Sequence, residues 1–457
     1  MDVARWTLRA LLAIALGVTA CGDPAPDRSR VGPNVLLYVV DTLRADALGA
    51  YGHPRVETPA LDALAAEGWL FERVYAPSSW TRPSVASLLT GAEPGAHGVN
   101  GRDEALPAGA RLLSEELRAS GYATAGFVTN PNVGSFFGFD QGFDHYEELY
   151  ARREPGRVGS GELVTRAGEV TEQAIAWLDE ATEPFFLFAL TTDPHWPYDP
   201  PASFDRYGGD YRGPVRDGGD AVKRADLGPA DRERVRAFYH GEVSANDAAF
   251  GALLEQLRQR GLADSTLVVF TADHGEEFWE HGRHGHGRQL FEESIRVPLV
   301  FAAPGLEARR AEAPVALIDV APTILDLLGL PAPAASQGRS LAGGAADGER
   351  RLHVRLDRGD DRVDALIAHP WKLIRDGASG RSALFDLRGD PRERRDLAAV
   401  EARRVDALNR ELAARAEANA RQRARLGGEA APVPSDALPA EARQALEALG
   451  YLEEDGP

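Results

Sequence analysis

The sequence predicts an α/β fold in which a mostly parallel β-sheet is sandwiched by helices and followed by a smaller C-terminal α+β subdomain. One observation is that short apolar runs bounded by Gly, Pro and Asp alternate with helical patterns. This alternation is typical of parallel sheets that carry helices on both faces. The other is that strand-like runs follow one another near the C-terminus, at 351–359, 364–376 and 382–391, which indicates a small antiparallel sheet.

The strands expected in the larger sheet share an apolar pattern without alternation. Residues 34–40 read NVLLYVV, and such an unbroken run indicates a strand that is buried on both faces. Similar runs occur at 123–128, 184–190, 265–270 and 297–302. We therefore expect these segments to form buried strands.

The helices expected around this sheet have recognisable ends or apolar faces. The first covers 58–68, with Thr58 as N-cap, Pro59 in the first turn and Gly68 at the end. Further helical patterns occur at 164–181, 229–261, 401–426 and 441–452. Residues 205–228, rich in Gly, Asp and Arg, lack periodicity and are interpreted as a surface loop.

Composition excludes some classes of partner. The chain has 457 residues and a formal net charge of -19, which argues against binding to nucleic acid or to an anionic lipid surface. The charge says little about the substrate, because a bound metal can invert the local field at a site. Lysine occurs only at Lys223 and Lys372.

The N-terminus has the pattern of a secretory signal. Arg5 and Arg9 precede a short apolar run at 10–18, and VTAC ending at the single cysteine, Cys21, resembles the bacterial lipobox. We expect residues 1–21 to be a lipoprotein signal peptide with its lipobox, and 22–33 a flexible tether. Lipidation of Cys21 would anchor an extracytoplasmic protein, and the absence of an acidic residue directly after Cys21 favours the outer membrane. The alternative is a short, uncleaved anchor helix.

Candidate ligands for a metal follow three of the expected strands. Asp41 follows the first, Asp193 and His195 follow the third, and Asp273 and His274 follow the fourth. One aspartate after a strand is usually a turn residue, but ligands of parallel sheets bind at the carboxyl ends of the strands. Three such ends together favour a metal site.

The stretch Ser78–Gly91 reads SSWTRPSVASLLTG and predicts a helix that ends at Gly91. Thr81 then lies at or just before the helix N-terminus, where free N–H groups favour an anion. Thr81 alone would be interpreted as an N-cap. Beside Asp41 and the Asp273–His274 pair, we favour a nucleophile.

These motifs resemble the sulfatase-like branch of the alkaline phosphatase superfamily. The resemblance rests on NVLLYVVDTLRADALGAYG, TRPSVASLLTG, FTADHGEEFWEHG, FEESIRVPLVF and LFDLRGDPRERRDL, in the family's order from about Asn34 to Leu397. It implies an alkaline-phosphatase-like fold and an ester hydrolase of sulfuric or phosphoric esters. We expect a catalytic domain at 34–345, a small subdomain at 346–425 and a tail with a short helix at 426–457.

The resemblance also implies roles for single residues. Asp41, Thr81, Asp273 and His274 match metal ligands, and Thr81 stands where arylsulfatases carry formylglycine. His195 and His286 match residues that contact the transferred group and are the other catalytic candidates. Asp193, His195 and His286 form a candidate second metal site or substrate-binding set. Weaker assignments are Asn130 and His97 as substrate-binding residues, Arg44 and Asp46 as structural ones, and His281 and His284 as supporting ones.

Three departures from the family pattern bear on the chemistry. Thr42 replaces an aspartate, Val85 replaces an arginine, and FVTNPN replaces a segment with lysine and histidine. Oxidation of Thr81 would give a ketone instead of the aldehyde of formylglycine, so no formylglycine is expected. A metal-bound threonine hydroxyl can still attack phosphorus, which favours phosphoesters over sulfate esters. At least one divalent metal is expected, with zinc, manganese, calcium and magnesium all compatible.

The leading functional hypothesis is a metal-dependent hydrolase of an anionic ester in the cell envelope or outside the cell. The first alternative is a transferase of phosphoethanolamine or phosphoglycerol to envelope glycans or lipids. The second is a non-catalytic binding protein that retains the fold. A sulfatase that uses threonine is a further alternative.

Overall fold

The computed structural model describes residues 32–150, 165–219, 221–224, 226–344, 350–358, 361–428 and 432–451. The expected signal peptide, Cys21 and most of the tether lie outside these residues. No helix in the described part is long and apolar enough to cross a membrane.

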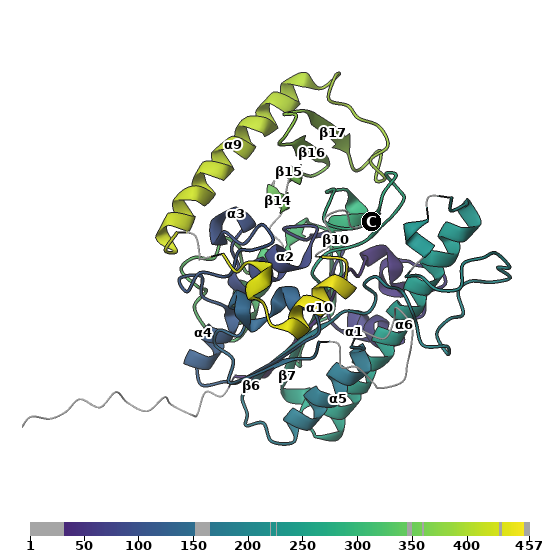
Figure 1. Ribbon diagram of the computed structural model, residues 1–457. Coiled ribbons are helices and arrows are strands. Elements are labelled where there is room, and N and C mark those ends of the chain that lie inside the picture. Colours follow the sequence, from purple (N-terminus) through teal and green to yellow (C-terminus); the bar gives the residue numbers. More distant parts are fainter. Residues whose placement is uncertain are drawn as a thin grey trace, which may run out of the picture. The chain divides into compact units, whose positions relative to one another are not determined.

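An eight-stranded sheet in the order β12-β2-β11-β7-β1-β6-β4-β5 forms the centre of the fold (Figure 1). Its strands are β1 (Asn34–Val40), β2 (Trp69–Phe71), β4 (Ala123–Val128), β5 (His145–Glu148), β6 (Phe185–Thr191), β7 (Thr266–Ala272), β11 (Leu299–Ala302) and β12 (Arg309–Ala311). The strands β7, β1, β6, β4 and β5 are mutually parallel, and every residue of β1, β6 and β7 is buried. The expectation of unbroken apolar strands inside a mostly parallel sheet is thus confirmed.

One expected strand runs in the opposite direction. Residues 297–302 contribute β11, which pairs antiparallel with both β7 and β2. Between β7 and β11 the chain forms only short elements, of which α7 (Glu292–Ile295) is the one α-helix. Parallel pairing normally requires a helical crossover, so this connection returns the chain antiparallel.

Helices cover both faces of the sheet (Figure 1). The helices α1 (Pro59–Glu67), α5 (Ala167–Leu178) and α6 (Pro229–Gln259) pack together on one face. On the other face α2 (Thr81–Thr90) packs against α4 (Leu113–Ala119) and α8 (Val320–Leu327). Thr58 is the N-cap of α1 and Pro59 its first residue, as the sequence indicates.

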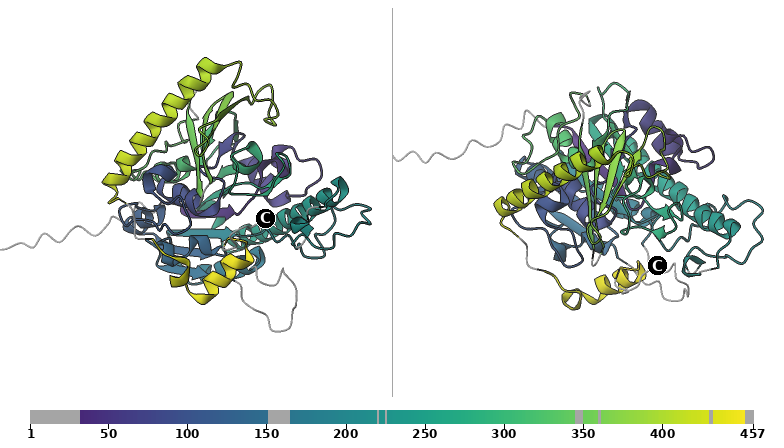
Figure 2. Two further views of the ribbon diagram at one scale, coloured as in Figure 1. Left: turned by 45° about the horizontal axis from the view of Figure 1, so that its top comes forward. Right: turned by 90° about the horizontal axis from the view of Figure 1, so that it is seen from above.

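A second, four-stranded antiparallel sheet follows near the C-terminus. It consists of β14 (Leu352–Arg358), β15 (Asp361–Ala368), β16 (Trp371–Asp376) and β17 (Ser382–Asp386). The long helix α9 (Ala402–Arg425) lies beside it (Figure 2). Leu408 and Leu412 of α9 are one helical turn apart and pack on Leu366, Leu373 and Leu384 of the sheet. This apolar contact forms a core of its own.

The remaining elements are short. The strands are β3 (Val74–Tyr75), β8 (Glu277–Phe278), β9 (His284–Gly285), β10 (Arg296–Val297) and β13 (Val315–Ala316). The α-helices are α3 (Pro94–His97) and, in the tail, α10 (Ala440–Ala448). The 3-10 turns are η2 (Ala45–Ala47), η3 (Gly49–Tyr51), η4 (Pro131–Val133), η5 (Ser135–Phe137), η7 (Ala221–Lys223), η8 (Ala263–Ser265), η9 (Leu317–Asp319) and η10 (Ser435–Ala437).

Candidate active site

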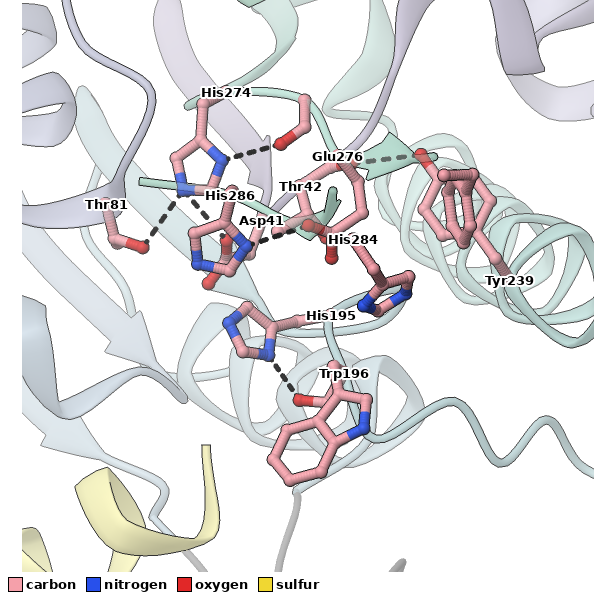
Figure 3. Close-up of polar contacts among 12 residues, drawn as sticks. Asp41, Thr42, Thr81, His195, Trp196, Tyr239, His274, Glu276, His284 and His286 are labelled. Carbon is pink, nitrogen blue, oxygen red and sulfur yellow. Dashed lines mark hydrogen bonds and ion pairs between the residues drawn. The ribbon is translucent and has the colours of Figure 1, made fainter. Parts of the chain in front are cut away.

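The register of the central strands places three strand ends at the same level. Val40, the last residue of β1, is paired with Thr191 of β6 on one side and with Ala272 of β7 on the other. The residues that follow these ends therefore meet at one edge of the sheet. Figure 3 shows His274, His286 and His195 gathered there beside Asp41 and Thr81.

Asp41, Asp273 and His274 form a group that can hold one metal ion, and all three side chains are buried. Nε2 of His274 lies 3.6 Å from Oδ1 of Asp41 and 3.5 Å from Oδ2 of Asp273. Its Nδ1 faces the carbonyl oxygen of Gly275 at 2.9 Å, which assigns the ring proton to Nδ1 and leaves Nε2 as an acceptor. Three atoms that can bind a cation thus lie within 4.8 Å of one another.

Each carboxylate of this group has one oxygen held by the protein and one without a partner. Asn130 donates to Oδ2 of Asp41 at 2.6 Å, and the backbone N–H groups of His274 and Thr42 donate to Oδ1 of Asp273 at 2.7 and 3.2 Å. Oδ1 of Asp41 and Oδ2 of Asp273 have no hydrogen-bond partner among the described residues. Buried oxygens of this kind are costly unless a cation binds them, so the residues fit a divalent metal.

The pKa shifts of the two aspartates also indicate a cation site. Burial raises the pKa of Asp41 well above its usual value, and the charge of Asp273 adds to the shift. Burial also raises the pKa of Asp273 to about 7. A bound cation reverses this situation, because it stabilises both carboxylates in their charged forms. Two oxygens and one imidazole nitrogen suit zinc or manganese and do not exclude magnesium or calcium.

The turn after β1 is held in an unusual backbone conformation. Thr42 has φ 57°, in the left-handed region that β-branched residues seldom adopt. Its N–H donates to Asp273, and its carbonyl accepts from the hydroxyl of Tyr239 at 2.9 Å. Both bonds fix the turn that presents Asp41. The side chain of Thr42 adds no carboxylate to the group.

Thr81 is the first residue of α2 and is completely buried, with Trp80 as the N-cap. Its Oγ1 lies 3.3 Å from Nε2 of His274 and 3.4 Å from Nδ2 of Asn130. The hydroxyl therefore borders the candidate metal group at a helix N-terminus, as the sequence predicts.

His195 and His286 face Thr81 from the other side of the site. Their ring centroids are 4.9 Å apart. Nδ1 of His195 bonds the carbonyl oxygen of Trp196, and Nδ1 of His286 lies 2.9 Å from Oε1 of Glu276. Both Nε2 atoms are thereby directed into the site. Burial and the charge of His286 lower the pKa of His195 to about 3, and burial and His274 lower that of His286 well below its usual value.

The structure does not bring Asp193 to these two histidines, which corrects the candidate second metal site. Its Oδ2 accepts from the backbone N–H of Ala167 at 2.6 Å, and its Oδ1 lies 3.3 Å from Arg166. The N-terminus of α5 and the guanidinium together attract the carboxylate away from the site. His195 and His286 therefore stay candidates for substrate contact, without Asp193.

His97 also lies outside the site, which corrects its assignment to substrate binding. Nε2 of His97 is 2.9 Å from Oγ of Ser87, six residues along α2 from Thr81. At a rise of about 1.5 Å per residue, the two α2 positions are roughly 9 Å apart. His97 thus packs α3 against α2. Asn130, by contrast, is both the N-cap of η4 and a direct neighbour of Asp41 and Thr81.

The other side chains singled out in the sequence form ion pairs or hydrogen bonds with neighbouring residues. Arg44 pairs with Asp46 at 2.8 Å, and His281 with Glu293 at 2.5 Å. His284 contacts the hydroxyl of Tyr198 at 3.2 Å. Lys372 is buried beside Glu393 at 2.8 Å and Glu292 at 3.1 Å, so its charge is already balanced.

Sequence reasoning missed two residues of the site. Glu276, two positions after His274, orients His286 and is completely buried. Its position in the motif DHGEE, close to the candidate ligands Asp273 and His274, could have indicated this role. Tyr451, in the tail, directs its hydroxyl to Thr81, His195 and His286, at 3.2, 3.0 and 3.1 Å. No motif marks it.

Residues 33–330 match the family model described as Sulfatase, which covers more than half of the chain. The chain belongs to the sulfatase family. Arylsulfatase K of Bos taurus is 27% identical over 452 residues, which cover 84% of this chain and 83% of the bovine protein. This family member is accordingly an ester hydrolase of the alkaline phosphatase-like superfamily, and its substrate class is an anionic ester.

Solved structures agree with this fold. One similar solved structure shows a protein in complex with its substrate D-glucosamine-2-N,6-O-disulfate. Its TM-score is 0.72 and its sequence identity is 21%, and the match covers 85% of the sulfatase-family chain and 99% of the neighbour. Another is the phosphonate monoester hydrolase SpPMH from Silicibacter pomeroyi, with a TM-score of 0.70, 25% identity and coverage of 85% and 96%. The alkaline-phosphatase-like fold expected from the sequence is thus confirmed.

Proposed function

We propose that the chain is a metal-dependent hydrolase that prefers phosphorus esters and uses the hydroxyl of Thr81 as its nucleophile. The observation that carries the proposal is the position of this hydroxyl, 3.3 Å from Nε2 of His274, one of the three side chains that can hold a metal. Asp41, Asp273 and His274 would hold the metal together with Thr81. When bound, the metal supplies positive charge that lowers the pKa of the hydroxyl and stabilises charge on the ester oxygens.

The residues support a two-step reaction. In the first step a bond forms between Oγ1 of Thr81 and phosphorus, the bond to the leaving oxygen breaks, and the Thr81 proton passes by way of Nε2 of His195 or His286 to the leaving oxygen. In the second step water attacks phosphorus, the bond between phosphorus and Oγ1 breaks, and one proton of the water returns to Oγ1 of Thr81. Because Nε2 of His195 and Nε2 of His286 both face the site as acceptors, either can take up the proton of the Thr81 hydroxyl and then hand it to the leaving oxygen.

Two facts favour phosphorus as the reacting atom. A threonine cannot give the aldehyde of formylglycine, so the hydroxyl itself must act. In addition, the solved structures that resemble this chain include a phosphonate monoester hydrolase. Sulfate esters are the second candidate, because the relative from Bos taurus carries the name of an arylsulfatase.

The deciding experiment compares esters and variants in metal-free protein that is reloaded with zinc, manganese, calcium or magnesium. The substrates are an aryl phosphate, an aryl phosphate diester, an aryl phosphonate monoester and an aryl sulfate. We expect metal-dependent turnover of a phosphorus ester. Thr81→Val keeps the shape without the hydroxyl and should lower kcat by about a thousandfold or more, whereas Thr81→Ser should stay active. Turnover of aryl sulfate alone, or an active Thr81→Val, would refute the proposal.

We also propose that Cys21 is lipidated and holds the enzyme on the outer side of a membrane, the outer membrane where there is one. The lipobox-like sequence VTAC supports this. Fractionation of cells that produce wild type or Cys21→Ser tests it: the wild type should sediment with membranes and incorporate labelled fatty acid. A wild type without incorporated label would contradict the assignment.

A further inference from the structure

The hydroxyl of Tyr451 occupies the centre of the proposed site. It lies 3.2 Å from Oγ1 of Thr81, 3.0 Å from Nε2 of His195 and 3.1 Å from Nε2 of His286. The side chain is 4% exposed and packs with the main core. Thus the nucleophile and both substrate-facing histidines converge on one oxygen atom, which belongs to the tail of the same chain.

The C-terminal cap of α10 positions this tyrosine. Gly450 has φ 75°, its N–H bonds the carbonyl of Glu447 at 3.0 Å, and the N–H of Tyr451 bonds the carbonyl of Leu446 at 2.8 Å. These two bonds and the left-handed glycine form a Schellman motif, which reverses the chain after a helix. The turn therefore directs Tyr451 back toward the site, and α10 itself packs against η4, directly after Asn130.

The ring of Tyr451 covers the approach to Thr81. Its centroid is 6.4 Å from that of Trp80, the residue before the nucleophile, and Cζ of Arg358 lies 5.4 Å from it. Packing beneath the tail is incomplete: a cavity of about 290 Å³ adjoins the tyrosine and is lined in part by Arg82, Arg102 and Arg358. The surface that the tail covers is thus aromatic and rich in arginine, which suits an anion.

An ester poised for attack needs the space that the tyrosine fills. A nucleophile must lie about 3 to 3.5 Å from the atom it attacks, and the phenolic oxygen lies at that distance from Thr81. The oxygens of the transferred group would lie in the same space beside Nε2 of His195 and His286 that the phenol fills. Tyr451 and a reactive ester therefore exclude each other.

We propose that the tail, residues 432–451, is an intrachain inhibitor whose Tyr451 occupies the ester site and must leave before an anionic substrate binds. The inference rests on the proposed function for the identity of the site. The phenol is a displaceable occupant, because its single O–H can donate to only one of the two Nε2 acceptors at a time. An oxyanion brings several oxygens and a negative charge to the metal group.

Binding of inorganic phosphate to full-length, manganese-loaded protein tests this proposal without any turnover. If the open form makes up about 1 to 10% of the molecules, Tyr451→Ala should bind phosphate about 10 to 100 times more tightly than wild type in calorimetry. Tyr451→Phe keeps the ring and should tighten binding less. Tyr122→Phe, which removes another buried hydroxyl, should leave the affinity unchanged because Tyr122 bonds Pro33 far from the site.

A second measurement uses the wild type alone. Hydrogen exchange of the α10 amides should speed up when phosphate is bound, because the anion releases the tail. Tighter phosphate binding without ester hydrolysis would leave the inference standing and refute the proposed function. Unchanged phosphate affinity in Tyr451→Ala together with a lower kcat would overturn the inference, since Tyr451 would then act in catalysis. Slower α10 exchange on phosphate binding would overturn it as well.

Discussion

Asn130 holds one oxygen of Asp41 and leaves the other for a metal. Its Nδ2 donates to Oδ2 of Asp41 at 2.6 Å, while its own Oδ1 accepts from the backbone N–H of Asn132 at 2.9 Å. The second bond fixes which end of the amide faces the carboxylate. Oδ1 of Asp41 is thereby turned toward His274.

Asn130→Ala should therefore weaken metal binding without removing a ligand. Partners that orient metal ligands typically contribute about 10 to 100-fold in affinity, and we expect a loss of that size in zinc or manganese titrations. Asn409→Ala is the matched control, because Asn409 bonds Arg375 and Ser382 in the small subdomain. Equal metal affinity in wild type and Asn130→Ala would show that Asp41 is oriented without the amide.

Asp41→Asn should have opposite effects on stability with and without metal. In the metal-free protein it removes a buried charge, while its amide oxygen can still accept from Asn130 and its NH₂ can donate to Nε2 of His274. We expect the free energy of unfolding to rise by about 1 to 2 kcal/mol. Wild type should gain about 4 kcal/mol at a free metal concentration a thousandfold above Kd, and the variant should gain little. Thermal unfolding with and without zinc measures both effects, with Asp326→Asn as a remote control.

Most of the candidate metal group could be predicted because it depends on local pattern and sheet geometry. Unbroken apolar runs identify β1 and β7 as central strands, and the parallel register then brings Asp41 next to Asp273 and His274. The start of α2 is likewise encoded locally, by residues 81–91. These features require only that strands of one sheet end at one edge.

The missed features depend on contacts between distant segments. Tyr451 is 370 positions from Thr81, and its approach requires the tail to pack on the larger domain. The carboxylate of Asp193 turns away because Arg166 and the start of α5 lie beside it, which the sequence of the strand alone does not reveal. The sequence assigns His97 weakly to substrate binding, and only packing shows its partner to be Ser87.

A buried histidine where the small sheet meets α3 predicts a pH dependence of stability. His353 of β14 lies 3.0 Å from Asp364 and 3.1 Å from Glu93, the N-cap of α3. Burial alone would lower the pKa of His353, but the hydrogen bonds to Asp364 and Glu93 raise it to about 9. Because the folded pKa exceeds the unfolded value of about 6.5, this stabilisation is fully present below pH ~6.5.

The stabilisation that His353 contributes should then be lost as the pH rises through about 9. The shift corresponds to about 3 kcal/mol at most. Urea unfolding at intervals from pH 6 to 10 should show this decline in wild type and a flatter profile in His353→Gln. His369→Gln serves as the control, because the pKa of His369 is lowered by burial instead. A decline of the same size in His353→Gln would assign it to other groups.

Lys372 and Glu393 should show strong coupling, since each is completely buried and they lie 2.8 Å apart. Burial raises the pKa of Glu393 to about 7 even though the charge of Lys372 lowers it. Lys372→Met leaves this carboxylate without its cation and should lower the free energy of unfolding by about 3 to 5 kcal/mol. The double variant Lys372→Met with Glu393→Gln should recover much of the loss, because only the partly exposed carboxylate of Glu292 then lacks its cation. Denaturant unfolding of the four proteins gives the coupling energy, and additive losses would show that the pair is not coupled.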